Sequence, residues 1–218
     1  RFALDRMVVL PLFGGHEPGF EQCVAGNRAA AALARTDTRF CPFARVHPAH
    51  GRAAVEELRR CFDEGFFGLK IWLTKADAPE MDPLMELLVE RGKPLLIHAM
   101  HKSTGNYAGE SDPRAVAVLA RQFPQAKIVM AHIGGNFLYG CEAVADCPNV
   151  WTDCSGTFCE QGMVGHAVRE LGADRVIFGS DAPGADFTAN LAKVTGADLP
   201  LGARQRVLHD NAAKLLGL

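Results

Sequence analysis

Short apolar runs recur along this chain at intervals of 22 to 33 residues. The runs begin near Met7, Phe40, Phe67, Pro94, Lys127, Asn149 and Arg175. Such a run is typical of a buried parallel strand, and each interval leaves room for one crossover helix. The recurrence therefore predicts seven strand–helix units, which is an α/β fold built around a parallel sheet.

Helical patterns occupy most of the intervals. They cover residues 21–35, 52–64, 83–91, 113–123, 163–171 and 204–216. Pro83 suits a first helical turn, and Asp112 can cap the helix that follows it. No linker, charge block or low-complexity segment separates the units, so residues 1–218 are predicted to form a single domain.

Two architectures accommodate seven such units. A doubly wound sheet usually carries a Gly-rich phosphate loop after an early strand, and the chain has neither G-x-G-x-x-G nor G-x-x-x-x-G-K-[ST]. A (β/α)8 TIM-like barrel with its N-terminal unit missing fits better, because one more unit of about 30 residues gives roughly 250. Residue 1 is Arg rather than Met, so we expect that processing or truncation has removed the start.

The composition is that of a soluble globular protein. Hydrophobic residues make up 48% and charged residues 22%, with a formal net charge of −2. We therefore expect no nucleic acid and no membrane as partner, but a small-molecule substrate, with a homodimer as an open alternative. Seven cysteines without C-x-x-C spacing suggest reduced thiols and a cytoplasmic protein.

Three of the apolar runs end in a residue that can bind a metal. His98 ends PLLIH, His132 ends KIVMAH and Asp181 ends RVIFGSD. Because the carboxyl ends of parallel strands meet at one face of a barrel, we expect these side chains to lie together there. Two imidazoles and a carboxylate suit one divalent metal ion and an activated water.

Five segments in order resemble the amidohydrolase superfamily, most closely its amidohydrolase-2 branch of metal-dependent hydrolases and non-oxidative decarboxylases. They are GLKIW (68–72), PLLIHA (94–99), IVMAHIGG (128–135), WTDCSG (151–156) and VIFGSDAPG (176–184). The resemblance implies that His98 ligates the metal and that His132 polarises a substrate carbonyl. It also implies that Asp181 contacts the metal and takes the proton from its bound water.

The chain departs from the family pattern at its beginning. The first family strand carries a His-x-His pair, and no H-x-H occurs in this sequence. The first apolar run, MVVLPLF, resembles the second strand of the family. Three explanations stay open: an incomplete copy of an active enzyme, other histidines that complete the ligand set, or a degenerate, metal-free relative.

Other polar residues near the predicted strand ends are weaker candidates. Lys70, Arg45, His47 and His101 are candidate substrate-binding residues, and Asp153, Ser155 and His16 are further candidates for the pocket. In binuclear relatives a Lys at the position of Lys70 can be carbamylated, but we favour an ion pair or a substrate carboxylate. A structural role in a loop is the competing interpretation for both His47 and His101.

These observations predict a metal-dependent hydrolase that acts on a small amide, ester or lactone through metal-activated water. The first alternative is a non-oxidative decarboxylase of a small carboxylic acid, and the second is a non-catalytic barrel remnant that acts in binding or assembly. The expected cofactor is one divalent metal ion, zinc first, with manganese, iron or cobalt as alternatives.

Overall fold

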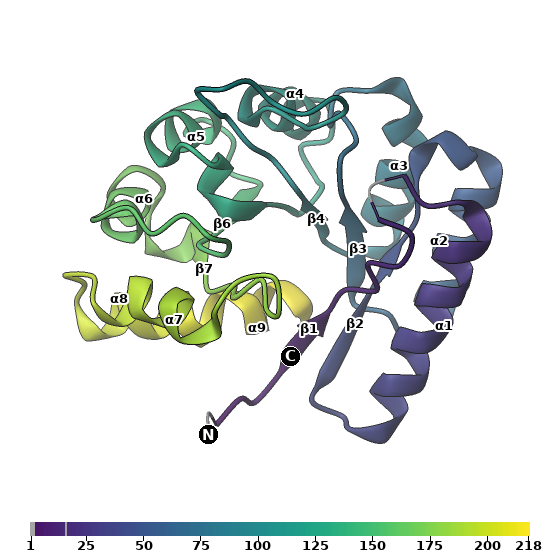
Figure 1. The fold of residues 1–218 in the computed structure, drawn as a ribbon, viewed down its shortest axis with the longest axis horizontal. Helices are drawn as coiled ribbons and strands as arrows, with labels where there is room; N and C mark the ends of the chain where they lie inside the picture. Colours follow the sequence, from purple (N-terminus) through teal and green to yellow (C-terminus); the bar gives the residue numbers. More distant parts are fainter. Residues whose placement is uncertain (1–2, 16) are drawn as a thin grey trace.

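The computed structural model, which describes residues 3–15 and 17–218, contains one curled sheet of seven parallel strands (Figure 1). The strands pair in chain order from β1 to β7. They are β1 (Met7–Val9), β2 (Phe40–Arg45), β3 (Gly68–Ile71), β4 (Leu95–Ile97), β5 (Ile128–Met130), β6 (Val150–Asp153) and β7 (Val176–Ile177). This arrangement is a half-barrel that matches a TIM-like barrel lacking one unit, as the sequence predicts.

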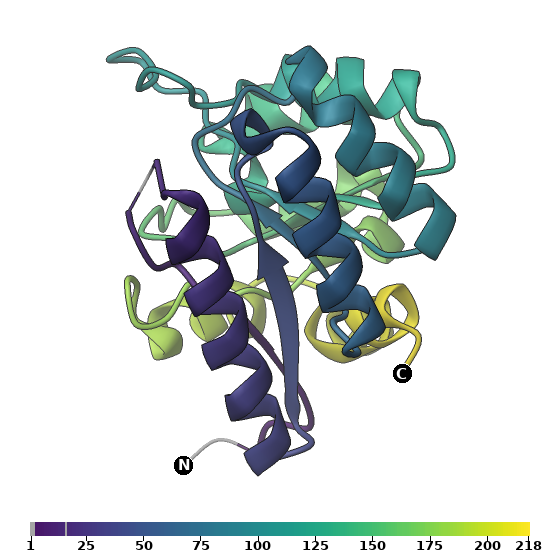
Figure 2. The same cartoon turned by 90° about the vertical axis from the view of Figure 1, so that its right-hand side faces the viewer.

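Helices follow the strands and lie around the outside of the sheet (Figures 1 and 2). They are α1 (Phe20–Thr36), α2 (Arg52–Asp63), α3 (Asp82–Arg91), α4 (Pro113–Gln122), α5 (Phe137–Val144), α6 (Met163–Leu171), α7 (Phe187–Thr195), α8 (Leu201–Gln205) and α9 (Asn211–Leu216). Among the described residues, no helix has the length and apolar character needed to cross a membrane.

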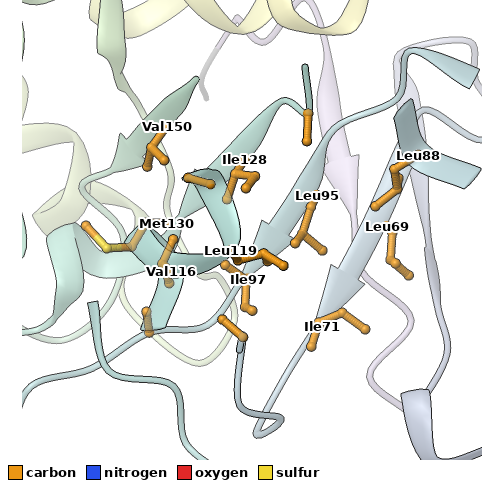
Figure 3. Close-up of a cluster of buried hydrophobic side chains, with 14 of the residues drawn as sticks. Leu69, Ile71, Leu88, Leu95, Ile97, Val116, Leu119, Ile128, Met130 and Val150 are labelled. Atoms are coloured by element: carbon orange, nitrogen blue, oxygen red, sulfur yellow. The ribbon is translucent and has the colours of Figure 1, made fainter. Parts of the chain in front are cut away.

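The two faces of the sheet bury different clusters. The main core lies between the outer face and the helices, and includes Leu69, Ile71, Leu95, Ile97, Ile128, Met130 and Val150 (Figure 3). A second cluster lies on the opposite face, where Val129 and Ile177 pack with Leu215 of α9. The inner face is therefore apolar where this second cluster lies, and its polar residues lie toward the carboxyl ends of the strands.

A buried polar network joins α1, β2 and α2. The Asn27 side-chain amide donates to Arg45 O (3.0 Å) and to Glu57 Oε1 (2.9 Å), and its Oδ1 accepts from Arg45 N (2.8 Å). These bonds satisfy polar groups that would be costly to bury alone. They also fix the end of β2, from which the Arg45 side chain projects.

The structure differs from the sequence expectations in three local details. Helices α5 and α7 fill intervals in which no helix was predicted. The predicted helix over 204–216 is divided into α8 and α9 by a π-helical turn, Arg206–Asp210. The strands also end earlier than the apolar runs, because the chain bends into tight turns before His132 and Asp181. All seven cysteines are free thiols, as predicted.

Gly68 at the start of β3 is required by packing. A Cβ at this position would lie 2.5 Å from the Phe43 ring and 2.7 Å from Pro94 O. We expect Gly68→Ala to lower the free energy of unfolding by about 1–3 kcal/mol, measured by urea denaturation. Gly202→Ala is the matched control, because nothing lies within 4 Å of a Cβ there. An unchanged midpoint for Gly68→Ala would contradict this account of the packing.

Candidate functional site

The predicted site residues occupy the carboxyl ends of the central and last strands. His98 follows β4 directly, and His132 lies in the short 3-10 turn after β5, Ala131–Gly134. Asp153 ends β6, while Asp181 lies beyond β7 and is exposed. Parallel pairing of β4 with β5 and of β5 with β6 brings the first three together at one edge of the sheet.

His98 and His132 are in direct contact. His98 Nδ1 lies 3.1 Å from His132 Nε2, and the two rings meet edge to face with centroids 5.0 Å apart. The rings of Trp72 and His98 also meet in a T-shaped arrangement, with centroids 6.4 Å apart. The structure thus forms the imidazole pair that the sequence predicts at neighbouring strand ends.

His132 is held in a strained and closely packed position. Its φ of 62° lies in the left-handed region, which is uncommon for a residue other than Gly. Its Nδ1 lies 3.2 Å from Ser155 O and 3.0 Å from Ser155 Oγ, whose hydroxyl donates to Asp153 Oδ1. Gly156 is needed beside the ring, because a Cβ there would lie 2.9 Å from His132 Nδ1.

Glu110 is a site residue that the sequence analysis did not identify. Its carboxylate accepts hydrogen bonds from Lys102 Nζ at both oxygens (2.8 Å each) and from Tyr107 N (2.9 Å). Its Oε1 also lies 2.9 Å from His98 Nε2. No local pattern marks this residue, because its position depends on how the segment after β4 folds back.

A row of polar contacts joins the Glu110 carboxylate, His98, His132 and Ser155. Two neutral imidazoles can satisfy the contacts on both sides of His98, because His98 Nε2–H can donate to Glu110 and His132 Nε2–H can donate to His98 Nδ1.

Protonation of the two imidazoles to their charged form is disfavoured at neutral pH. Burial, together with the neighbouring imidazole of His132, lowers the pKa of His98 to about 4, although Glu110 acts in the opposite direction. Burial also lowers the pKa of His132. Both imidazoles are therefore held in the neutral form, which is the form that binds a divalent metal ion.

The site contains side chains of the types that bind metal ions, but too few of them lie together to form a complete set of ligands. Among the described residues, no group of three or more His, Cys, Asp and Glu side chains is arranged to hold a metal ion. Asp181 does not complete such a group with His98. The φ of Asp181 is 54°, so its backbone, like that of His132, lies in the left-handed region.

Lys70 lies inside the curled sheet on β3 and is 5% exposed. Burial lowers its pKa from the ordinary value of 10.5 to about 8, while the carboxylates of Asp153 and Asp181 act in the opposite direction. Arg45 pairs with Lys70 across β2 and β3 and is also buried. Its guanidinium donates to Phe13 O (2.8 Å) and to Gly15 O, so it holds the loop after β1.

The remaining candidates have structural partners of their own. His47 caps a short 3-10 turn, because its Nδ1 accepts from Ala49 N (3.2 Å). His101 stacks on Tyr139 with centroids 3.7 Å apart and lies 3.0 Å from Asp112 Oδ2. Neither contacts the His98–His132 pair. The candidate His16 lies outside the described residues.

Solved structures with this fold include several decarboxylases. A 2,6-dihydroxybenzoate decarboxylase from Rhizobium is 19% identical, with a TM-score of 0.74 over 91% of this chain and 77% of the enzyme. A 5-carboxyvanillate decarboxylase from Sphingomonas paucimobilis is 19% identical, with a TM-score of 0.72 over 93% and 74%. A dihydroxybenzoic acid decarboxylase from Polaromonas sp. JS666, solved with manganese and 2-nitroresorcinol, is 19% identical, with a TM-score of 0.71 over 91% and 76%.

The family comparison covers nearly the whole sequence. No curated protein matches the chain. The family model described as amidohydrolase, which represents the amidohydrolase-2 branch, matches residues 5–218. This match and the shared barrel fold agree with the order of strand-end motifs. The chain belongs to the amidohydrolase family, in its amidohydrolase-2 branch.

Proposed function

We propose that this protein is a non-oxidative decarboxylase of a small carboxylic acid. The observation that carries the proposal is the buried Lys70 ammonium on the same inner face as the pair formed by half-buried His98 and buried His132. A cation in this position attracts a carboxylate substrate, whereas a neutral amide or ester would gain less from it. The decarboxylases that share this fold support the same choice.

The proposed chemistry breaks a carbon–carbon bond and leaves its electron pair on the substrate carbon as CO2 departs. Lys70 stabilises the negative charge that moves from the carboxylate into the rest of the substrate. A proton from solvent replaces CO2 on carbon; it enters at His98 and passes through His132, so that both imidazoles are neutral before and after the step. His98 and Asp181 are the predicted metal ligands, and a divalent ion bound there would supply Lewis-acid stabilisation of substrate oxygens.

Hydrolysis of a small amide, ester or lactone is the second candidate. One observation favours it: Asp181 is exposed beyond β7, where a carboxylate can accept a proton from an attacking water. In that reaction His132 would polarise the carbonyl group of the substrate. The two candidates differ in product, so one assay separates them.

We expect the protein, assayed with added Mn²⁺ in D2O, to release CO2 from an ortho-hydroxybenzoic acid. One deuterium should replace the carboxyl group, because the proton delivered to carbon comes from solvent. His132→Asn should lower kcat by about 10²–10⁴-fold, the usual contribution of a positioned acid or base. CO2 evolution and mass spectrometry of the product give these values.

His166→Asn is the matched control, because His166 lies on α6 and its ring meets Phe137 rather than the site. Its activity should equal that of the wild type. Hydrolysis of esters or lactones without CO2 release from any acid would replace the proposal by the second candidate. Failure of both reactions would favour the non-catalytic alternative.

Lys70 gives a prediction about pH. Since its pKa falls from 10.5 to about 8 on folding, the native state loses this proton near pH 8 and the unfolded chain keeps it until near pH 10.5. The free energy of unfolding should therefore rise with pH across this window, by about 3 kcal/mol in total from this group. Lys70→Met should lack this rise in urea denaturation between pH 7 and pH 10.

Lys75→Met is the matched control, since Lys75 is exposed and the substitution removes the same charge. It should keep the wild-type pH dependence. In the assay above, KM for the carboxylate substrate should rise above pH 8 in the wild type, where the Lys70 ammonium is lost. The same pH profile in Lys70→Met and in the wild type would exclude Lys70 as the group that titrates.

A further inference from the structure

The chain that leaves β6, residues 154–156, lies directly against the His132 ring. Ser155 contacts His132 Nδ1 through both its carbonyl oxygen (3.2 Å) and its hydroxyl oxygen (3.0 Å). Gly156 is so near that a Cβ there would lie 2.9 Å from the same nitrogen. The orientation of the imidazole therefore depends on how this 154–156 segment is held.

Lys193 on α7 holds the segment at two points. Its Nζ donates to Cys154 O (3.0 Å) and to Gly156 O (2.9 Å), the carbonyls on either side of the residue that contacts the imidazole. The third bond goes to Asn190 Oδ1 (2.8 Å). An ammonium has three donors, so all of them are used, and bonds from a charged donor are the stronger kind. The two carbonyls are thus fixed in direction.

Asn190 extends this connection to the segment after β7. Its side chain is buried, and its Nδ2 donates to Ser180 O (3.0 Å) and to Asp186 O (2.9 Å). Ser180 directly precedes Asp181 in the sequence. One turn of α7 therefore ties together the two strand-end segments of the site, through the bond between Lys193 and Asn190.

We propose that Lys193 is a positioning residue for His132, on which it acts through the 154–156 segment. Lys193 bonds to the segment rather than to the imidazole, so it takes no part in the proton transfer itself. It keeps the ring turned toward His98 Nδ1, 3.1 Å from His132 Nε2. A purely structural lysine would stabilise the packing of α7 and leave the state of the ring unchanged, which makes the two roles separable.

The state of the ring can be observed by NMR. In two-bond ¹H–¹⁵N spectra of the ¹⁵N-labelled chain, loss of a signal in His132→Asn assigns the His132 nitrogens. The wild type should show the shifts of an imidazole held in one neutral tautomer, because its hydrogen bonds are fixed. In Lys193→Met the shifts should move toward the average of both tautomers. Lys193→Arg keeps a cation with donors for both carbonyls and should restore much of the wild-type spectrum.

Turnover gives a second readout, and this part of the test rests on the proposed function. In the decarboxylase assay, Lys193→Met should lower kcat by about 10²-fold, as expected for a misplaced reacting group. KM should stay unchanged, because Lys70 still attracts the carboxylate. In the His132→Asn background, Lys193→Met should cause no further loss of kcat, because Lys193 acts only through the imidazole.

Lys214→Met is the matched control, because Lys214 is also a lysine on a helix, α9, and its side chain is exposed. It should match the wild type in the spectrum and in kcat. Circular dichroism shows whether each variant is folded. If Lys193→Met does not fold, Lys193→Gln takes its place, since its amide can still donate to one of the carbonyls.

Any of three results would overturn the proposal. The first is a folded Lys193→Met chain whose His132 shifts equal those of the wild type. The second is an equal change of these shifts in Lys214→Met. The third is a loss of kcat from Lys193→Met that is as large in the His132→Asn background as in the wild type. If the wild type releases no CO2, the proposed function fails, while the NMR comparison still decides whether Lys193 positions the ring.

Discussion

The whole site depends on the uniform direction of the seven strands. Every neighbouring pair is parallel, and the pairs follow chain order. All carboxyl ends therefore meet at one edge, which is where a barrel presents its chemistry. The register then separates the two faces: Leu69 and Ile71 on β3 belong to the main core, while Lys70 between them points to the inner face. A single reversed strand would send His98, His132 or Asp153 to the opposite edge.

Burial explains the electrostatics of this edge. Removal of water disfavours the charged form of any group, so the pKa values of Lys70, His98 and His132 all fall for the same first reason. Charges that persist must then have partners, as Glu110 has in Lys102. Glu110 Oε1 also lies 2.9 Å from His98 Nε2, so this carboxylate links the imidazole pair to Lys102.

The apolar runs were sufficient to predict most of the fold. Each strand begins within one residue of its predicted start, because a buried parallel strand must be apolar on both faces. Helices α5 and α7 were missed, since eight or nine residues give little periodicity. Pairing of His98 with His132 followed from the topology alone. The position of Glu110 beside His98 did not, because it depends on the path of a 13-residue connection. Arg45 and His101 remain predicted substrate-binding residues, and their loop contacts could not be foreseen from strand position.

Backbone strain bears on whether these strand ends serve chemistry or packing. Among the described residues, four other than Gly have positive φ, and His132 and Asp181 are two of them. Each such conformation costs on the order of 1–3 kcal/mol and persists only where the surroundings impose it. The polar contacts of His132 are with His98, Ser155 and Asp153, and these hold the residue in this conformation. A barrel stabilised for assembly alone gains nothing from holding an imidazole this way. A site that must hold two imidazoles in contact does, and this favours the enzyme over the non-catalytic remnant.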